Sequence, residues 1–258
     1  MDTVIEFTNV RKRLGQRQVL DGMDLRVRRG ETMVIIGRSG IGKSVSLKHI
    51  VGLLRADSGR VVVDGIDVGE ADHSTLLRLR SKMGVLFQSG ALIHWLTVAD
   101  NVALPLRELG GYTEKQIEAI VQEKLDLVDM RESSLLTPDK ISGGMQKRAA
   151  LARAIVRDPE IILYDEPTAG LDPVLAKITT ELITGIQKRL GVTSLVVTHD
   201  MQSAYVIADR IAMLHAGRVI QVGTPDEIKN STDIAVRQFI EGRTVGPLTD
   251  EMEAVWKK

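Results

Sequence analysis

The chain has 258 residues, of which 43% are hydrophobic and 26% are charged, and its formal net charge at pH 7 is zero. This composition is typical of a globular protein with an ample core, and it excludes a disordered chain. The balanced charge argues against a nucleic-acid partner, because neutralising phosphates requires clustered Lys and Arg. The absence of cysteine excludes disulfides and thiolate metal sites.

Neither a membrane span nor a secretory signal is visible in the sequence. No apolar run is long enough to cross a bilayer, and the first residues lack the basic and apolar regions of a signal peptide. We therefore expect the chain to remain in the cytoplasm.

The N-terminal part of the chain is predicted to form antiparallel strands. Short stretches of alternating polarity run from Val4 to Val27, with a turn expected at residues 14–16. The apolar run at residues 33–36 predicts a buried strand, and a further strand that ends in a turn is expected at residues 61–65.

A glycine-rich loop follows the strand at residues 33–36 and precedes a helix. Glycine allows backbone conformations that a Cβ would forbid, so consecutive N–H groups can converge on one anion. The helix adds the positive end of its dipole, the lysine adds an ammonium, and the last serine offers a hydroxyl to Mg²⁺. The match to G-x-x-x-x-G-K-[ST] is complete and predicts a phosphate site for a nucleoside triphosphate. This phosphate loop consists of Gly37, Arg38, Ser39, Gly40, Ile41, Gly42, Lys43 and Ser44.

Helices and strands alternate in the remainder of the chain. A helical pattern runs from Thr97 to Met130, and apolar strands return at residues 161–164 and 193–197. The helix between these two strands is predicted to begin at Asp172 and to end near Gly191. Continuous apolar strands that alternate with helices indicate a parallel sheet covered on both faces.

Polar side chains suited to nucleotide chemistry follow three buried strands. Asp165 suits Mg²⁺ coordination together with Ser44, because Mg²⁺ prefers oxygen ligands, whereas Glu166 can orient or deprotonate an attacking water. His199 can donate to a γ-phosphate or hold that water. Gln88 can offer its amide oxygen to Mg²⁺ or to water, or bond a nearby main chain. An acidic pair also occurs as a helix-capping turn, and a lone histidine is often structural; the phosphate loop favours the catalytic interpretation.

A second potential anion site stands at the start of a later helix. Ser142 is followed by Gly143 and Gly144, whose exposed N–H groups suit a phosphate that approaches from outside the chain. Ser142 alone would satisfy a plain N-cap, but that interpretation leaves the paired glycines unexplained.

Along the chain the motifs come in the order glycine loop, Gln88, Ser-Gly-Gly, Asp-Glu and His. In this order they resemble the motifs of the ATP-binding subunit of ABC transporters, across nearly the whole chain. The resemblance implies an ATPase that uses ATP and Mg²⁺, with Lys43, Glu166 and His199 as catalytic residues and with Ser44, Gln88 and Asp165 as metal ligands. The implied motifs are the Walker A loop at 37–44, the Q-loop at Gln88, the signature at 141–145, the Walker B strand at 161–166, the D-loop at 169–172 and the switch histidine His199.

The implied fold is an α/β P-loop NTPase of the RecA-like kind. It has a mostly parallel sheet flanked by helices, an N-terminal antiparallel β subdomain and an inserted α-helical subdomain at about residues 90–155. A single ATPase domain would occupy residues 1–245, and residues 246–258 would form a C-terminal tail. Two copies are expected to bind head to tail as an ATP-sandwich homodimer, with each phosphate loop facing the signature of the other copy.

Two positions depart from the family pattern. Met145 stands where the signature usually has Gln, although Ser142 to Gly144 are intact. Leu14 stands where many relatives carry an aromatic residue that stacks on adenine. Leu14 therefore implies an apolar contact with the base, to which Arg13 or Val19 can contribute.

A narrower resemblance is to the ATPase of MCE-associated lipid transport systems, the Mla type, and it is carried by residues 87–92, 141–154 and 236–242. It implies an integral membrane permease, an MCE-domain lipid-binding protein, a lipid cargo and a peripheral position on the inner face of the cell membrane. An importer ATPase for amino acids, metals or sugars is the alternative. A non-transport clamp on DNA, RNA or ribosomes usually needs a long coiled-coil insertion or tandem cassettes, and the sequence has neither.

Overall fold

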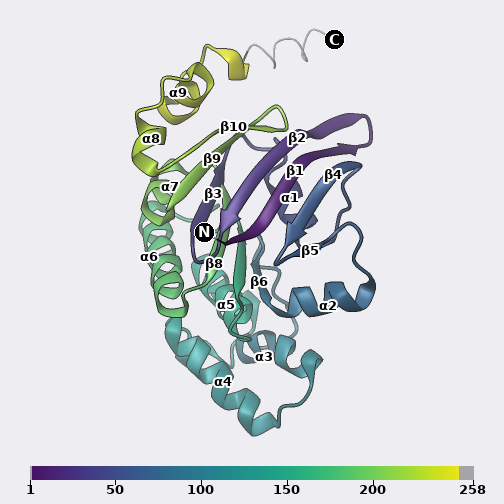
Figure 1. The fold of residues 1–258 in the computed structure, drawn as a ribbon. Helices are drawn as coiled ribbons and strands as arrows, with labels where there is room; N and C mark the ends of the chain where they lie inside the picture. The colour runs from purple at the N-terminus through teal and green to yellow at the C-terminus, as the bar shows by residue number, and fades with distance from the viewer. Residues whose placement is uncertain (1, 250–258) are drawn as a thin grey trace. The chain divides into compact units, whose positions relative to one another are not determined.

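The structure, a computed structural model, describes residues 2–249, and these form two compact units. The first unit combines residues 2–71 with residues 197–249, and the second consists of residues 72–196. Strands and helices alternate along most of the chain (Figure 1), which confirms the predicted α/β class.

An antiparallel sheet begins the first unit, as predicted. Its strand order is β2-β1-β4-β5, and each neighbouring pair is antiparallel. The two longest strands lie side by side (Figure 1) and are joined at Gly15, whose φ of 60° suits the tight turn. Inward side chains such as Ile5 and Phe7 are buried. The strands are β1 (Thr3–Leu14), β2 (Arg17–Arg28), β4 (Ser58–Val63) and β5 (Ile66–Asp67).

Three further strands, with one parallel and one antiparallel pairing, form the second sheet region of this unit. β3 (Thr32–Ile36) is buried at every residue and pairs in parallel with β9 (Arg210–His215). β10 (Arg218–Gly223) pairs antiparallel with β9, which completes the order β10-β9-β3. The continuous burial of β3 fits the apolar run from which that strand was predicted.

The hairpin between β9 and β10 is anchored on β2. Ala216 and Gly217 both have positive φ values, 47° and 75°, as a two-residue hairpin turn requires. The N–H of Asp21 donates to the carbonyl of Gly217 at 2.9 Å. A Cβ on Gly217 would lie 2.7 Å from that nitrogen, so only glycine permits the approach.

The helices of the first unit are short, and the C-terminal pair was not predicted. Gln238 in the last helix is buried, and its side chain accepts from the N–H of Leu248 at 2.8 Å and donates to Thr249. The described start of the predicted tail therefore packs on this helix; residues 250–258 lie outside the described residues. The helices are α1 (Lys43–Ile50), α7 (Met201–Ile207), α8 (Pro225–Lys229) and α9 (Ile234–Glu241).

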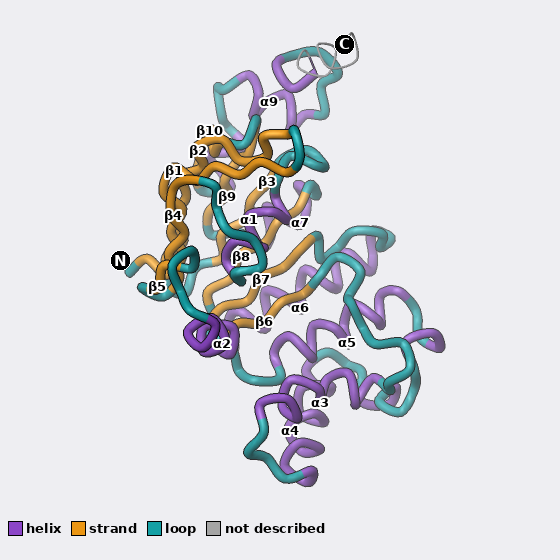
Figure 2. The backbone as a smooth tube through the Cα atoms, turned by 90° about the vertical axis from the view of Figure 1, so that its right-hand side faces the viewer, coloured by secondary structure: helices purple, strands orange, loops and turns teal. Residues whose placement is uncertain are grey.

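The second unit combines buried strands with most of the long helices. β6 (Met83–Leu86) pairs in parallel with β7 (Ile161–Asp165), and β8 (Thr193–Thr198) follows in the order β8-β7-β6, its last two residues belonging to the first unit. Figure 2 shows the helices of this unit in purple. They are α2 (His73–Ser81), α3 (Val98–Leu109), α4 (Glu114–Leu127), α5 (Gly143–Ile155) and α6 (Pro173–Leu190), with 3₁₀ turns η1 (Arg131–Ser133) and η2 (Pro138–Lys140).

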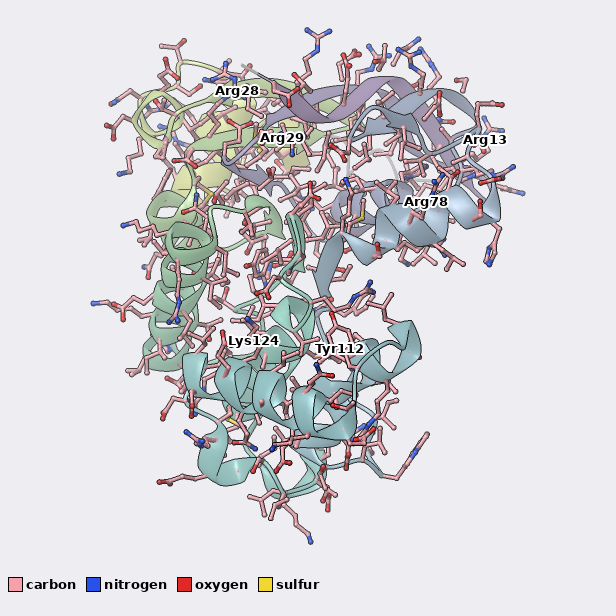
Figure 3. All side chains as sticks on the ribbon, turned by 60° about the horizontal axis from the view of Figure 1, so that its bottom comes forward. Arg13, Arg28, Arg29, Arg78, Tyr112 and Lys124 are labelled. Atoms are coloured by element: carbon pink, nitrogen blue, oxygen red, sulfur yellow. The ribbon has the colours of Figure 1, made fainter. Side chains whose placement is uncertain are left out.

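The helical stretch predicted from Thr97 onward is two helices. Gly110 and Gly111, with φ values of 72° and 84°, end α3 and separate it from α4. Lys124 of α4 (Figure 3) is buried and donates to Glu123 and, at 2.7 Å, to Asp158 in the loop before β7. No helix in the described part of the chain is long and apolar enough to cross a membrane.

Gly84 in β6 provides a test of this packing. A Cβ at this position would lie 2.2 Å from the carbonyl oxygen of Ala154 in α5, so Gly84→Ala must push the strand from the helix. We expect a loss of about 2 kcal/mol or more in the free energy of unfolding, as for other overpacked cores. Gly185→Ala, at an exposed site in α6 where a Cβ meets nothing within 4 Å, is the matched control.

Urea denaturation followed by circular dichroism measures both variants. The control should be unchanged or more stable by about 0.5–1 kcal/mol, because alanine restricts the unfolded chain more than glycine does. Equal stability of the two variants would contradict the close packing of β6 on α5.

Candidate nucleotide-binding site

The phosphate loop has the backbone that its glycines were predicted to supply. Gly37, Gly40 and Gly42 have φ values of 153°, 75° and 117°, in the region that favours glycine. A Cβ at Gly37 would lie 2.6 Å from the carbonyl oxygen of Leu214, and one at Gly42 would lie 2.9 Å from a methyl group of Val19. The loop is therefore fixed by close contact with β9 and β2, and two of its glycines cannot be replaced without moving a neighbour.

The helix after the loop differs from all the others at its start. α1 follows Gly42 without a side-chain N-cap, and its first turn holds no acidic residue. The other eight α-helices of the described residues each begin with a capping Ser, Thr or Asp. An N-terminus without such a cap, at the end of a glycine loop, suits an external anion.

The side chain of Lys43 bends back to the first two residues of the phosphate loop. Its side chain is 5% exposed, and its ammonium donates to the carbonyls of Gly37 at 2.8 Å and Arg38 at 3.2 Å. Both acceptors are uncharged main-chain carbonyls, so these two bonds do not neutralise the ammonium. The geometry fits the oxyanions of a nucleotide.

The side chain of Arg38 takes a direction that the sequence did not indicate. Its guanidinium donates to the carbonyl of Leu248, a buried residue near the C-terminal end of the described chain. Since Leu248 is also bonded to Gln238 of α9, the phosphate loop and the C-terminal segment are joined within the first unit. Nothing in the sequence near either residue signals this contact.

The residues expected beside the base lie in the first unit. Leu14 ends β1 and is 42% exposed, and Arg13 (Figure 3) is exposed beside it. Val19 is buried against Gly42 of the phosphate loop. Their role toward adenine stays a prediction.

The acidic pair of the second unit follows β7. Asp165 is the last residue of the strand and is half-buried, and Glu166 is 8% exposed. The φ of Glu166 is 48°, a left-handed conformation that is strained for a residue with a side chain. Its carbonyl accepts from the N–H of Ala169 at 3.1 Å, which helps to hold the turn. Backbone strain of this kind is concentrated at functional sites.

The loop that begins at Gln88 is held by side chains of α5. Gln88 is exposed, and its carbonyl accepts from the ammonium of Lys147. The guanidinium of Arg153 donates to the carbonyls of Gly90 and Ala91, both at 2.7 Å. Lys147 and Arg153 were missed in the sequence, where a cation in a helix is indistinguishable from a solvated one.

The two glycines at the start of α5 differ in their surroundings. Ser142 accepts from the N–H of Met145 at 3.3 Å and is an ordinary N-cap. A Cβ on Gly144 would lie 3.2 Å from Leu175, so this glycine serves packing against α6. Gly143 is exposed, and a Cβ there would meet nothing within 4 Å. The open position that packing does not explain is therefore Gly143.

The predicted site residues are divided between the two units. His199 is exposed directly after β8, and the next residue, Asp200, caps α7. The phosphate loop and His199 belong to the first unit, and Gln88, Ser142, Gly143, Gly144, Asp165 and Glu166 belong to the second. No cluster of three or more acidic or histidine side chains suited to a metal occurs among residues 2–249.

A buried strand, a glycine loop with left-handed backbone and an uncapped helix define a P-loop nucleoside-triphosphatase. Residues 20–169 match the ABC transporter family. The chain belongs to this family.

Named relatives cover almost all of the chain. It is 41% identical over 248 residues to the probable ribonucleotide transport ATP-binding protein mkl of Mycobacterium leprae, covering 96% of this chain and 72% of that protein. It is 40% identical to the intermembrane phospholipid transport system ATP-binding protein MlaF of Haemophilus influenzae, covering 95% and 93% of the two chains. MlaF of Escherichia coli K12 is 38% identical, with coverage of 95% and 91%.

Solved structures of ATP-binding cassettes share the fold. The ATP-binding cassette MJ0796, in a dimeric post-hydrolysis state bound to ADP and Pi, is 32% identical with a TM-score of 0.79, over 86% of this chain and 98% of that one. CbiO1 from Clostridium perfringens, part of the ABC transporter complex cbiONQ, is 25% identical with a TM-score of 0.81 over the full length of both. The predicted P-loop fold is confirmed by these relatives.

His49 in α1 gives the phosphate-loop helix a predictable response to pH. The side chain is 1% exposed, and its Nδ1 lies 2.7 Å from the carbonyl oxygen of Val45. Burial is the main cause that lowers the pKa of His49; the bond to Val45 opposes it, and the nearby charge of Lys12 lowers the pKa further. The folded chain therefore binds this proton less readily than the unfolded chain.

We expect the free energy of unfolding to fall as the pH drops below about 6.5, the ordinary pKa of histidine. One proton contributes a slope of at most about 1.4 kcal/mol per pH unit, and the loss ends below the lowered folded-state pKa. Urea titrations at pH 7.5 and pH 5.5 measure this difference. His49→Gln should reduce it and the exposed His94→Gln should not; identical slopes in all three proteins would contradict the assignment.

Proposed function

We propose that the chain is the ATP-binding and ATP-hydrolysing subunit of an ABC transporter and that it works as a homodimer with ATP between the two copies. The observation that carries the proposal is the exposed Gly143 in the first turn of α5, where a Cβ would meet nothing within 4 Å, so that packing does not explain the glycine. In a head-to-tail dimer this position binds the phosphate held by the loop of the other copy. A dimeric ATP-binding cassette bound to ADP and Pi among the structural relatives supports a dimer that holds nucleotide.

The phosphate loop is proposed to bind the phosphates of the nucleotide. Mg²⁺ is proposed to be bound by the last serine of the loop and by residues at the ends of two strands. Backbone N–H groups of residues 37–44 and the ammonium of Lys43 bind the phosphates. Ser44, Gln88 and Asp165 supply the hydroxyl, amide and carboxylate oxygens that Mg²⁺ prefers. When bound, Mg²⁺ neutralises charge that develops on the phosphates during transfer.

Glu166 is proposed as the group that orients or deprotonates the attacking water. Its buried side chain is carried on a strained backbone, so its direction is restricted before the substrate binds. His199 is proposed to donate to the γ-phosphate or to hold the same water. Preorganised groups of this kind stabilise the transition state without reorganising during the reaction.

ATP binding and hydrolysis are proposed to close and open the dimer. The γ-phosphate contacts groups of both chains, so its loss removes an interaction that only the closed state makes. A ligand shifts such an equilibrium by its difference in affinity for the two states. This population shift is what the chain would deliver to a membrane partner.

A groove beside the Gln88 loop is the proposed docking site for the permease. It has a volume of about 300 Å³. A lining that combines apolar side chains with two arginines suits a short amphipathic helix that carries an acidic residue. Its lining includes Phe87, Ala91, Leu104, Pro105, Arg153 and Arg157.

Phospholipid or a related lipid is the proposed cargo, moved between membranes with an MCE-domain lipid-binding protein. The support is the identity of about 40% with MlaF proteins over nearly the whole of both chains. The subunit would then lie on the inner face of the cell membrane, bound to its permease. A small-solute importer is the second candidate, favoured by the relatives named for ribonucleotide transport.

The sandwich dimer is tested by Glu166→Gln, which keeps the size of the side chain and removes its ability to take a proton. With ATP and Mg²⁺ this variant should bind nucleotide, hydrolyse it at least about a hundredfold more slowly and sediment as a dimer. Lys43→Ala should remain monomeric under the same conditions, since it loses the phosphate contact. A Glu166→Gln protein that binds ATP tightly yet stays monomeric, with or without permease, would refute the sandwich.

The docking groove and the cargo are tested together by co-purification of the tagged chain with its membrane permease. Leu104→Glu places a charge in the groove and should reduce recovery of the permease at least about tenfold, because burying an unpaired carboxylate is costly. Ile178→Glu, in a separate apolar groove on α6, is the control and should not reduce it. Mass spectrometry of the wild-type complex should detect bound phospholipid; a complex with a bound small solute and no lipid would favour the importer.

A further inference from the structure

α5 carries a buried cation that reaches two of the site segments at once. The side chain of Lys147 is 7% exposed, although lysine is rarely buried unless it is paired. Its ammonium donates to the carbonyl of Gln88 and, at 3.4 Å, to the carbonyl of Glu166. These are the residues at which the Gln88 loop begins and the strained turn after β7 is formed.

The carbonyl of Glu166 belongs to the residue with the left-handed backbone. A φ of 48° costs free energy in a residue with a Cβ, and it persists only where its surroundings enforce it. The carbonyl accepts from the N–H of Ala169 on one side and from Lys147 on the other. Lys147 is therefore a donor that helps to hold the peptide group of Glu166 in this conformation.

The electrostatic setting of Lys147 agrees with this role. Burial lowers the pKa of Lys147, and the carboxylates of Asp165 and Glu166 oppose that effect. The acidic pair thus helps to retain the ammonium, while the ammonium itself donates to main-chain oxygens of Gln88 and Glu166. A neutral side chain of the same length would fill the space without making either bond.

We propose that Lys147 is a positioning residue for ATP hydrolysis, which fixes Glu166 and Gln88 relative to each other and to α5 within one chain. The inference rests on the proposed role of Glu166 in hydrolysis, and it adds Lys147 to the residues on which hydrolysis depends. Lys147 acts through the main-chain carbonyls of Glu166 and Gln88, whereas the groups proposed for catalysis and for Mg²⁺ are the side chains of these residues. Loss of the ammonium should therefore slow the chemical step more than it weakens ATP binding.

Three variants test the proposal in the full-length chain. Lys147→Met removes the ammonium and keeps an unbranched apolar side chain, and Lys147→Arg restores a cation. Lys124→Met is the matched control, because Lys124 is a buried lysine of the same unit whose ammonium binds the carboxylates of Glu123 and Asp158. Measurements of kcat, of the Kd for ATP and of thermal unfolding separate catalysis from stability.

Lys147→Met should lower kcat by about tenfold to a hundredfold, in keeping with the cost of misplacing a catalytic group, and change the Kd for ATP less than threefold. Lys147→Arg should recover most of the rate. Lys124→Met should lose stability and keep its kcat at temperatures where it is folded. A kcat for Lys147→Met within twofold of the wild type, or equal losses of kcat in both methionine variants, would overturn the proposal.

Failure of the proposed function gives a different result from failure of this inference. If the wild-type chain and its permease complex do not hydrolyse ATP, the proposed function itself is wrong and the role of Lys147 fails with it. If the wild type hydrolyses ATP and Glu166→Gln abolishes hydrolysis, the proposed function stands, and the kcat of Lys147→Met alone decides the inference. Both results come from the same assay.

Discussion

The constraint on which the rest of the site depends is that several backbone N–H groups must point at one anion. Left-handed backbone at Gly37 and Gly42 meets this demand, and both glycines are packed so tightly that a Cβ would collide with β9 or β2. The strands on either side are therefore part of the loop's geometry. An uncapped α1 completes the arrangement, because a side-chain cap would compete with the anion for the same N–H groups.

Those parts of the fold and site that depend on local chemistry could be predicted from the sequence. The phosphate loop is one such part, since its glycines, lysine and serine act within eight consecutive residues. The buried strand β3 and the start of α6 at Asp172 are others, because burial and capping leave local patterns. For Gly144 the sequence suggested an anion site, which stays a prediction, and the structure adds a packing contact with Leu175 that the sequence did not reveal.

The contacts that could not be predicted join residues far apart in the chain. Lys147 reaches the carbonyl of Gln88 across 59 positions, and Arg38 reaches Leu248 across 210. In the sequence each is one more cation in a chain with 34 Lys and Arg, and nothing local separates it from a solvated one. The left-handed backbone of Glu166 is equally invisible, because glutamate has no preference for that conformation.

α5 brings two kinds of positive charge to different places. Its N-terminus presents Gly143 and the helix dipole outward, while Lys147 and Arg153 direct their charges inward to main-chain oxygens. Burying these cations costs free energy that apolar side chains would avoid. In return, the bonds of Lys147 and Arg153 tie α5 to the Gln88 loop and to the carbonyl of Glu166. Hydrogen bonds depend on distance and angle, so they fix the position of these main-chain groups relative to the helix more narrowly than an apolar contact does.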